Sequence, residues 1–168
     1  MLEIYTIGED ILREKSKKVE KFDSALELLV DAMLEKMDEA DGVGLAAPQI
    51  GVNLRVFVID DHRRVRTAFI NPEIVETSME ECSMEEGCLS IPGVYSFLTR
   101  SEKVTVQAQD VNGKTFRIEA DELLARAIQH ENDHLNGVLF VDRLEEKTRS
   151  KLIRTYEKRN KIQKGSIL

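Results

Sequence analysis

The spacing of hydrophobic residues predicts an amphipathic helix near the start of the chain. Asp23 or Ser24 is typical of a helix N-cap, and the apolar residues that follow recur at steps of three and four, which places them on one helix face. These residues are Leu26, Leu29, Val30, Met33 and Met37. The helix should end near Asp41-Gly42, because glycine favours helix termination.

Two later segments also have helical spacing. From Asp121 to Leu135 the apolar positions recur at helical steps, and Asn136-Gly137 supplies a stop. The last segment, from Glu145 to about Lys164, carries only a thin apolar stripe among charged residues. We therefore expect it to form an exposed helix that docks along one side of the molecule.

Between the first two helices the pattern indicates short strands. Strand signals cover residues 55–59, 68–70, 74–76, 103–109 and 115–119, and a further short strand is predicted at 138–141. Asn112-Gly113 is typical of a tight hairpin turn, so 103–109 and 115–119 should be antiparallel neighbours. Residues 42–49 contain two glycines and a proline and indicate a closely packed loop.

This order of elements predicts an α+β fold rather than regular βαβ alternation. We expect antiparallel or mixed sheets of short strands around a central second helix, with an N-terminal helix and an exposed C-terminal helix. The 168 residues are 42% hydrophobic, which suits a single domain over residues 1–168 with a substantial core.

Composition excludes several classes of protein. Two cysteines cannot form a disulfide framework, and no apolar run exceeds four residues, which is too short to cross a membrane. The first five residues lack the basic and apolar regions of a secretory signal, so a cytoplasmic location is expected. The formal net charge of −7 argues against wrapping of bare nucleic acid by the whole surface.

The net charge conceals an asymmetry along the chain. Residues 145–168 contain eight Lys and Arg against three acids, a formal charge of +5, whereas the first 144 residues carry −12. Such a difference marks either a tail with its own partner or a solvated last helix.

The second predicted helix contains two histidines four residues apart, in His130-Glu131-Asn132-Asp133-His134. At this spacing both imidazoles lie on one helix face and can reach a single ion, the HExxH arrangement of metallohydrolases. The alternative is a pair of surface histidines. Apolar residues continue the histidine face and flank Glu131, which a solvated helix would not show, so the pattern favours metal binding.

A catalytic metal usually takes three protein ligands and leaves one position open. Cys88 is our candidate for the third ligand, because Gly87 and Pro92 bracket a short extended piece around it and a thiolate is an excellent soft ligand. His62 lies in a polar turn and is expected to be solvated. Cys82 is the competing thiol, which we interpret as structural.

Such a site predicts hydrolysis. A divalent ion lowers the pKa of a bound water from about 16 toward about 7, although a thiolate ligand weakens the effect. Glu131 can take the proton as the water attacks a carbonyl carbon and return it to the leaving nitrogen. Backbone N–H groups near Cys88 and the side chain of Gln49 are candidate donors to the oxyanion. Asp133 suits a supporting role beside the imidazoles.

Three segments together resemble the three motifs of bacterial peptide deformylases, in the same order. They are Gly42-Val43-Gly44-Leu45-Ala46-Ala47-Pro48-Gln49, Glu86-Gly87-Cys88-Leu89-Ser90, and the stretch from Gln129 to Gly137 that contains the histidines. The resemblance covers most of the chain. It implies removal of the formyl group from the N-terminal formylmethionine of nascent polypeptides, with release of formate.

The resemblance also implies a role for each matching residue. Cys88, His130 and His134 would bind one metal ion, Fe²⁺ in most of the family, with Zn²⁺, Ni²⁺ or Co²⁺ able to substitute. Glu131 would be the general base and acid, and Gln49 and the Leu89 N–H would stabilise the oxyanion. Val43 and Gly44 would line the groove for the substrate backbone.

A further implication concerns the ribosome. In this family the C-terminal helix is associated with docking near the exit tunnel, and a basic segment on an acidic body is suited to meeting ribosomal RNA. The partners implied are therefore formylmethionyl nascent peptides and the ribosome, with no membrane and no DNA.

Two residues depart from the family pattern. Tyr95 lies in the stretch where many members carry an arginine that helps to hold the substrate, and Asp41 stands where many have glutamate. Both changes concern contacts beyond the methionine.

Two other classes of protein, metalloproteases and structural metal modules, share parts of this pattern. A metalloprotease would use the same motif, but its usual third ligand lies downstream, and no histidine follows His134. A structural metal module would need a fourth protein ligand such as Cys82, and Glu131 would then have no catalytic role.

Overall fold

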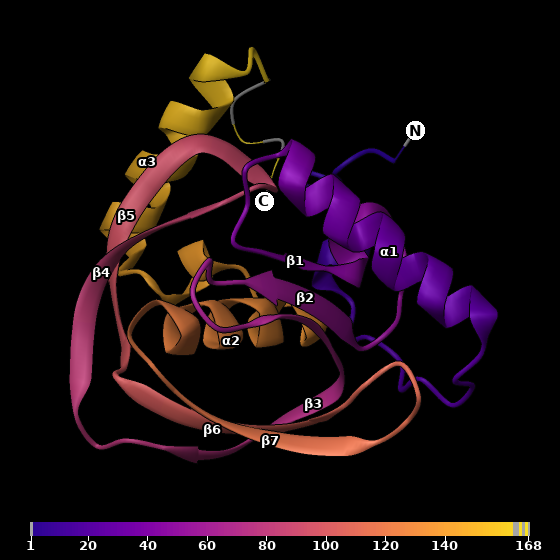
Figure 1. The fold of residues 1–168 in the computed structure, drawn as a ribbon. Helices are drawn as coiled ribbons and strands as arrows, with labels where there is room; N and C mark the ends of the chain where they lie inside the picture. The colour runs from indigo at the N-terminus through magenta and orange to yellow at the C-terminus, as the bar shows by residue number, and fades with distance from the viewer. Residues whose placement is uncertain (1, 163–164, 166, 168) are drawn as a thin grey trace.

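The structure is a computed structural model that describes residues 2–162, 165 and 167 (Figure 1). Lys164, counted above among the basic residues of the tail, lies outside the described residues. The first half of the chain forms η1 (Asp10–Arg13), α1 (Ser24–Glu39), β1 (Gly44–Ala46), η2 (Ala47–Ile50), β2 (Val56–Asp60), β3 (Arg66–Thr77) and β4 (Glu81–Cys88). The second half forms β5 (Ile91–Ser101), β6 (Lys103–Gln109), β7 (Thr115–Asp121), α2 (Glu122–Leu135), η3 (Phe140–Arg143) and α3 (Glu146–Arg159).

The strands form two separate antiparallel sheets. Five strands pair in the order β1-β2-β3-β6-β7, and β4 and β5 form a two-stranded ribbon of their own. The predicted hairpin is confirmed, because β6 pairs with β7 in a register that joins Gln109 to Thr115 and Lys103 to Asp121. In the five-stranded sheet β1 is an edge strand, which leaves one side of its backbone free of sheet partners.

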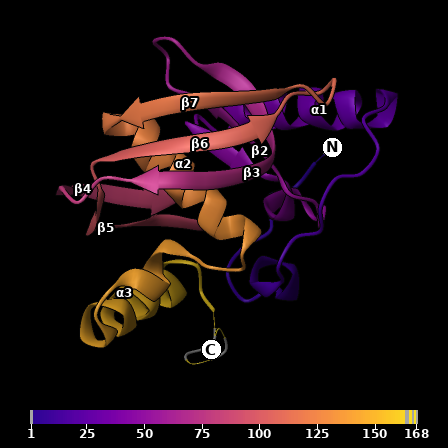
Figure 2. The same ribbon diagram turned by 90° about the horizontal axis from the view of Figure 1, so that it is seen from below.

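Helices cover both faces of the large sheet. Val56 and Val58 of β2 pack in one cluster with the apolar face of α1, whereas Phe57 and Ile59 pack in another with α2. Burial on both faces explains why β2 is a continuous apolar run and not an alternating one. Figures 1 and 2 show α2 enclosed between this sheet and the β4–β5 ribbon, the central position that the sequence predicted.

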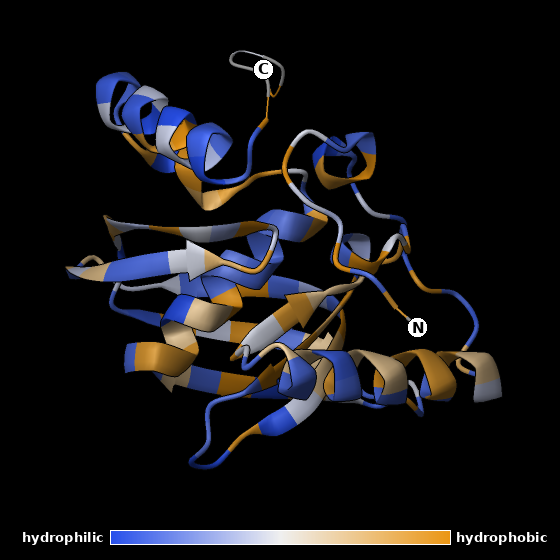
Figure 3. Ribbon diagram, turned by 90° about the horizontal axis from the view of Figure 1, so that it is seen from above, coloured by the Kyte–Doolittle hydropathy of each residue, from blue (hydrophilic) through white to orange (hydrophobic). Residues whose placement is uncertain are grey.

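Helix α3 lies along the outer side of β5. Its Ile153 and Tyr156 pack with Val94 and Leu98 of β5 in a third buried cluster, and the rest of the helix is mostly hydrophilic (Figure 3). This arrangement confirms an exposed helix docked on one side, although α3 ends at Arg159, before the predicted end near residue 164. Among the described residues no helix is both long and apolar enough to cross a lipid bilayer.

Three local predictions were wrong. Residues 42–49 are not a loop, since they include the edge strand β1 and the turn η2, and residues 138–141 are not a strand, because the 3₁₀ helix η3 begins at Phe140. The separate strands at 68–70 and 74–76 are parts of β3, which continues through Asn71-Pro72 with a register shift. The left-handed backbone of Asn71 (φ 50°) and its hydrogen bonds to Val19 and Gln109 hold this irregularity.

Candidate metal centre and active-site cleft

The second helix presents both histidines of the motif on its inner face. His130 and His134 are one turn apart, with ring centroids separated by 5.1 Å, and both side chains are buried. Burial and the positive charges of His130 and Arg100 lower the pKa of His134 well below its usual value. His134 is therefore neutral at pH 7, and the neutral imidazole is the form that binds metals.

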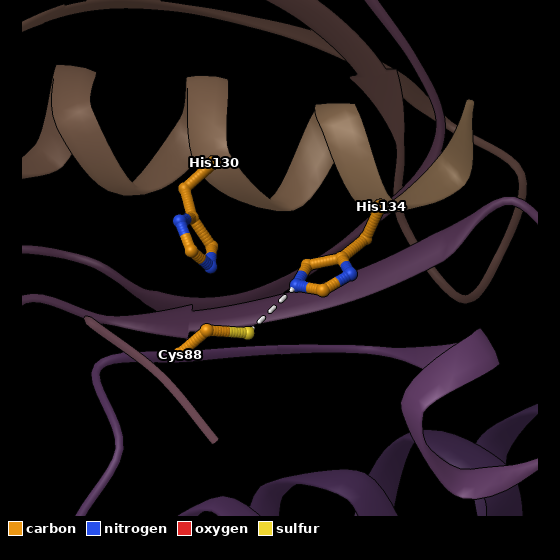
Figure 4. Close-up of side chains that lie close together, drawn as sticks. All are labelled: Cys88, His130 and His134. Atoms are coloured by element: carbon orange, nitrogen blue, oxygen red, sulfur yellow. Dashed lines mark hydrogen bonds between the residues drawn. The ribbon is translucent and has the colours of Figure 1, made fainter. Parts of the chain in front are cut away.

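Cys88 reaches the same point from the opposite side. It is the last residue of β4, and its Sγ lies 3.3 Å from Nε2 of His134 (Figure 4). One donor atom from each of Cys88, His130 and His134 lies within 4.8 Å of the other two. The close-up shows the two imidazoles coming from α2 and the thiol coming from the strand below them.

These three residues fit a single metal ion. A tetrahedral ion with bonds of about 2.0–2.3 Å separates its ligand atoms by about 3.5 Å, close to the Sγ to Nε2 distance. Two imidazoles and a thiolate suit iron, zinc, nickel or cobalt and leave one position open. Among the described residues the group of possible ligands contains no fourth member. The arrangement supports a bound metal ion and favours a catalytic over a purely structural centre.

The other ring nitrogen of His130 is held by a buried carboxylate. Nδ1 lies 2.9 Å from Oε1 of Glu86. Burial would raise the pKa of Glu86, but hydrogen bonds from His130 and Arg100 and the charge of Arg100 hold it well below its usual value. An ionised Glu86 can only accept, so Nδ1 donates the proton and Nε2 is left free to face Cys88.

For His130 itself two influences oppose each other. Burial lowers the pKa of its imidazole, but hydrogen bonds to Cys88 and Glu86 and the charge of Glu131 raise the pKa more. The surroundings thus favour positive charge at Nε2, which a metal ion can supply in place of a proton.

Glu86 and Asp133 anchor a buried network of arginines behind the histidines. The Arg100 guanidinium donates to Glu86 at 2.6 and 3.1 Å and to Asp133 at 2.9 Å. Arg126 adds a 2.7 Å bond to Glu86, and Arg143 binds Asp133 at 2.6 and 2.7 Å. The network fixes the end of β4 against α2, and so fixes the thiol relative to the imidazoles.

The carboxyl of Glu131 is buried beside the histidines. Among the described residues its Oε1 has no hydrogen-bond partner. Burial raises the pKa of Glu131 to about 7, with the nearby charge of Glu86 adding to the effect and that of His130 opposing it. A Cβ built on Gly44 would lie 2.7 Å from Oε2, so the absence of a side chain there makes room for the carboxylate. This group is suited to exchange protons near neutral pH.

A cleft of about 500 Å³ opens onto the centre and collects most of the predicted site residues. Its lining includes Val43, Gly44, Gln49, Cys88, Leu89, His130 and Glu131. His134 does not line the cleft but lies beneath it, in contact with the Cys88 thiol. Residues from three distant segments of the chain therefore converge on one cavity.

Gln49 is held in one orientation at the floor of this cleft. Its Oε1 accepts a 2.9 Å hydrogen bond from the Ala46 N–H, which turns Nε2 toward Ser90 Oγ at 3.1 Å and Cys88 Sγ at 3.7 Å. The side chain is 1% exposed. A rigid N–H donor therefore stands beside the proposed third ligand, where a developing oxyanion could be stabilised.

The alternative ligands lie elsewhere. His62 is exposed in a turn with a left-handed backbone (φ 59°) beside Asp60. Cys82 is at the far end of β4, where its Sγ lies 3.6 Å from Nη2 of Arg126. Neither belongs to the cluster of possible ligands around His130.

Sequence reasoning missed the supporting residues Glu86, Arg100 and Arg126. Arg126 carried a usable signal, since it interrupts the apolar residues of α2 and is buried there. A charged residue on the buried side of a helix requires a partner, and Glu86 supplies it. Arg100 carried no such signal, because its burial depends on the β4–β5 ribbon, which the sequence pattern did not predict.

Comparisons with known proteins agree on one family. The family model described as polypeptide deformylase matches residues 1–150. The peptide deformylase of Borreliella burgdorferi is 49% identical over 156 residues, which cover 92% of this chain and 94% of that protein. The crystal structure of a peptide deformylase from Legionella pneumophila superposes with a TM-score of 0.91 at 45% identity and covers 96% of each chain. One from Synechococcus elongatus in complex with actinonin has a TM-score of 0.89 at 42% identity, covering 99% of this chain and 91% of that one.

Proposed function

The chain belongs to the polypeptide deformylase family, and on this premise we propose that it removes the formyl group from the N-terminal formylmethionine of nascent polypeptides and releases formate. The observation that carries the proposal is the convergence of Cys88, His130 and His134 at a cleft that Glu131 and Gln49 also line. Because such substrates are made on ribosomes, the proposed location is the cytoplasm.

The metal would be held by Cys88, His130 and His134. When bound, a divalent ion polarises the formyl carbonyl and makes water acidic enough to be deprotonated near pH 7. We propose Fe²⁺ as the native ion, with Zn²⁺, Ni²⁺ or Co²⁺ able to replace it, because this mixed sulfur and nitrogen ligand set suits all four.

Glu131 would move the proton. Its buried carboxylate accepts a proton from the attacking water and then delivers it to the methionine nitrogen as the bond from carbon to nitrogen breaks. A pKa near 7 suits both directions of transfer at neutral pH. With Oε1 free of partners among the described residues, no hydrogen bond has to be broken before the transfer.

Two donors would stabilise the negative charge on the formyl oxygen. Gln49 Nε2 is turned toward Cys88 and Ser90 by the hydrogen bond from the Ala46 N–H to Oε1. The backbone N–H of Leu89, which also lines the cleft, follows directly after Cys88 in the chain. Donors fixed before the reaction need no reorganisation as the charge develops.

The substrate backbone would lie along the free edge of β1. Val43 and Gly44 border the cleft at this edge, where an extended peptide can pair with backbone groups that have no sheet partner. Leu89, Leu123 and Ala127 supply apolar lining for the methionine side chain. A metalloprotease reading has no comparable support, since the third donor comes from β4 and not from a residue after His134.

The proposed function is tested by formate release from formyl-Met-Ala-Ser. Protein purified without oxygen should contain about one metal ion per chain and release formate, and a chelator should abolish turnover until Fe²⁺, Zn²⁺, Ni²⁺ or Co²⁺ is returned. Cys88→Ala should lose both the ion and the activity, whereas Cys82→Ala, which changes the thiol outside the cluster, should keep both. Turnover that survives complete removal of the ion would contradict the proposal.

We also propose that the outer face of α3 binds ribosomal RNA near the exit tunnel. Lys147, Arg154 and Lys158 are exposed on this helix, and a cluster of cations binds RNA phosphates in a salt-dependent way. Because Ile153 and Tyr156 of the same helix are buried in the core, deletion of the tail would disturb the fold, and surface substitutions are the better test.

Replacing Lys147, Arg154 and Lys158 together by alanine should weaken cosedimentation with ribosomes by about tenfold or more at low salt, with a smaller effect at high salt. A matched triple variant of Lys103, Lys114 and Arg117, which are exposed on β6, the β6–β7 turn and β7, should bind normally. Equal binding by both triple variants and the unmodified protein would refute a role for α3.

A further inference from the structure

The active-site cleft shares one wall with a second groove. Gly93, Val94 and Tyr95 of β5 line both the cleft and a groove of about 390 Å³ between β5 and α3. The rest of the groove is lined by Ser96, Thr148, Lys151, Leu152, Thr155 and Arg159. A peptide that leaves the cleft over Tyr95 therefore meets a hollow surface along α3, which lies beside β5 in Figures 1 and 2.

Tyr95 lies between the two cavities and borders both. It pairs with Gly87 across the ribbon, and a Cβ built on Gly87 would lie 2.5 Å from its ring, so the ring covers the backbone next to Cys88. Even so, Tyr95 is 62% exposed, and Phe97 on the same face of β5 is 66% exposed. Two exposed aromatic rings beside a cleft are a typical contact surface for a bound chain.

Strand geometry indicates which residue of a substrate peptide would reach Tyr95. Tyr95 lies one strand spacing, about 4.8 Å, from Gly87, and Gly87 is one residue, about 3.3 Å, from Cys88. The two steps amount to about 8 Å, so an extended chain of about 3.3 Å per residue that starts beside Cys88 passes Tyr95 near its third residue. The groove along α3 would then receive the chain from about the fourth residue onward.

The groove differs from the cleft in charge. Four acids, Asp41, Glu85, Glu86 and Glu131, line the cleft together with one arginine, Arg126, whereas the charged residues that line the groove are Lys151 and Arg159. Arg159 donates a hydrogen bond from Nη1 to the Gly93 carbonyl, which holds its guanidinium beside the shared wall. A guanidinium has five N–H donors, so this bond leaves others to meet a carboxylate.

We propose that the groove between β5 and α3 binds the nascent chain from about its fourth residue and favours acidic side chains there. The inference rests on the proposed deformylase activity and adds a downstream substrate preference to it. Lys151 and Arg159 line the groove, whereas Lys147, Arg154 and Lys158 do not. Lys151 is four residues after Lys147 and three before Arg154, so it lies at the rim of the groove next to the outer face of α3.

The test compares kcat/KM for two peptides that differ only beyond the third residue, formyl-Met-Ala-Ser-Asp-Asp-Ala and formyl-Met-Ala-Ser-Lys-Lys-Ala. The acidic peptide should be favoured about tenfold at low salt, and added salt should reduce the ratio. The Lys151→Ala/Arg159→Ala variant should bring the ratio close to one, and reversing both charges with glutamate should favour the basic peptide.

Controls separate this inference from the function it rests on. Formyl-Met-Ala is too short to reach the groove, so failure of the unmodified protein to cleave it would refute the deformylase function itself. If formyl-Met-Ala is cleaved but the two long peptides are cleaved equally, the groove proposal is wrong. The Lys147/Arg154/Lys158 variant should keep the preference for the acidic peptide. If this variant loses the preference as well, the preference comes from the overall charge of α3 and the groove proposal is wrong.

Discussion

We expect the Glu131→Gln variant to keep its metal ion and to release formate from formyl-Met-Ala-Ser about a thousandfold more slowly than the unmodified protein. Glutamine has nearly the size of glutamate, so the fit against Gly44 is preserved. It cannot accept or return a proton, and a positioned acid or base contributes about 10²–10⁴-fold to such reactions. Because the three proposed metal ligands are untouched, metal content should stay near one ion per chain.

Glu157→Gln is the matched control, since Glu157 is also a buried glutamate on a helix but lies in α3, away from the cleft. It should turn over formyl-Met-Ala-Ser at the normal rate. Metal analysis and the midpoint of thermal unfolding, measured on both variants, separate loss of chemistry from loss of fold. Normal turnover by Glu131→Gln, or loss of metal as complete as in Cys88→Ala, would disprove the assigned role.

The part of this centre that lies on α2 could be predicted because it is local. Two histidines four residues apart share a helix face in any α-helix, and the apolar residues around them show that the face is buried. Glu131 follows from the same periodicity. Cys88 is different, because no spacing along the chain relates it to α2. Its choice over Cys82 rested on ligand chemistry, the neighbouring glycine and the family resemblance, and the structure places it in contact with His134.

The β4–β5 ribbon escaped prediction for a physical reason. One face of β4 is solvated, and the other carries Cys82, Met84 and Glu86, so the strand lacks the apolar alternation that marks a half-buried strand. Glu86, the most buried residue of that face, is held by ion pairs to Arg100 and Arg126. Charged residues that become buried only in pairs look solvent-exposed in the sequence.

Short apolar runs were ambiguous for another reason. Val138 to Val141 has the composition of a buried strand, but the chain turns into η3, where Phe140 and Val141 fill a cluster with Ile153 and Tyr156. Burial alone selects apolar residues, whatever the backbone conformation, and four residues are too few to show a period.

The buried ion pairs of Arg100 with Glu86 and Asp133 should contribute strongly to stability. Arg100→Met should lower the free energy of unfolding by about 3–5 kcal/mol, because removing one partner of a buried ion pair leaves the carboxylates of Glu86 and Asp133 short of charge and hydrogen bonds. A domain of this size is stable by only about 5–15 kcal/mol, so a urea titration should show a clear fall in the midpoint. Metal affinity should fall by about 10–100-fold, since Glu86 orients His130.

Arg66→Met is the matched control for this prediction. Arg66, like Arg100, donates three hydrogen bonds to two carboxylates, those of Asp38 and Asp60, but its side chain is 43% exposed compared with 4% for Arg100. Exposed ion pairs contribute little to stability, so its urea midpoint should hardly move and its metal affinity should be unchanged. If Arg100→Met is too unstable to purify, Arg100→Lys keeps the charge without the planar fork and should show an intermediate loss. Equal midpoints for the Arg66→Met and Arg100→Met variants would mean that packing, and not this network, holds β4 against α2.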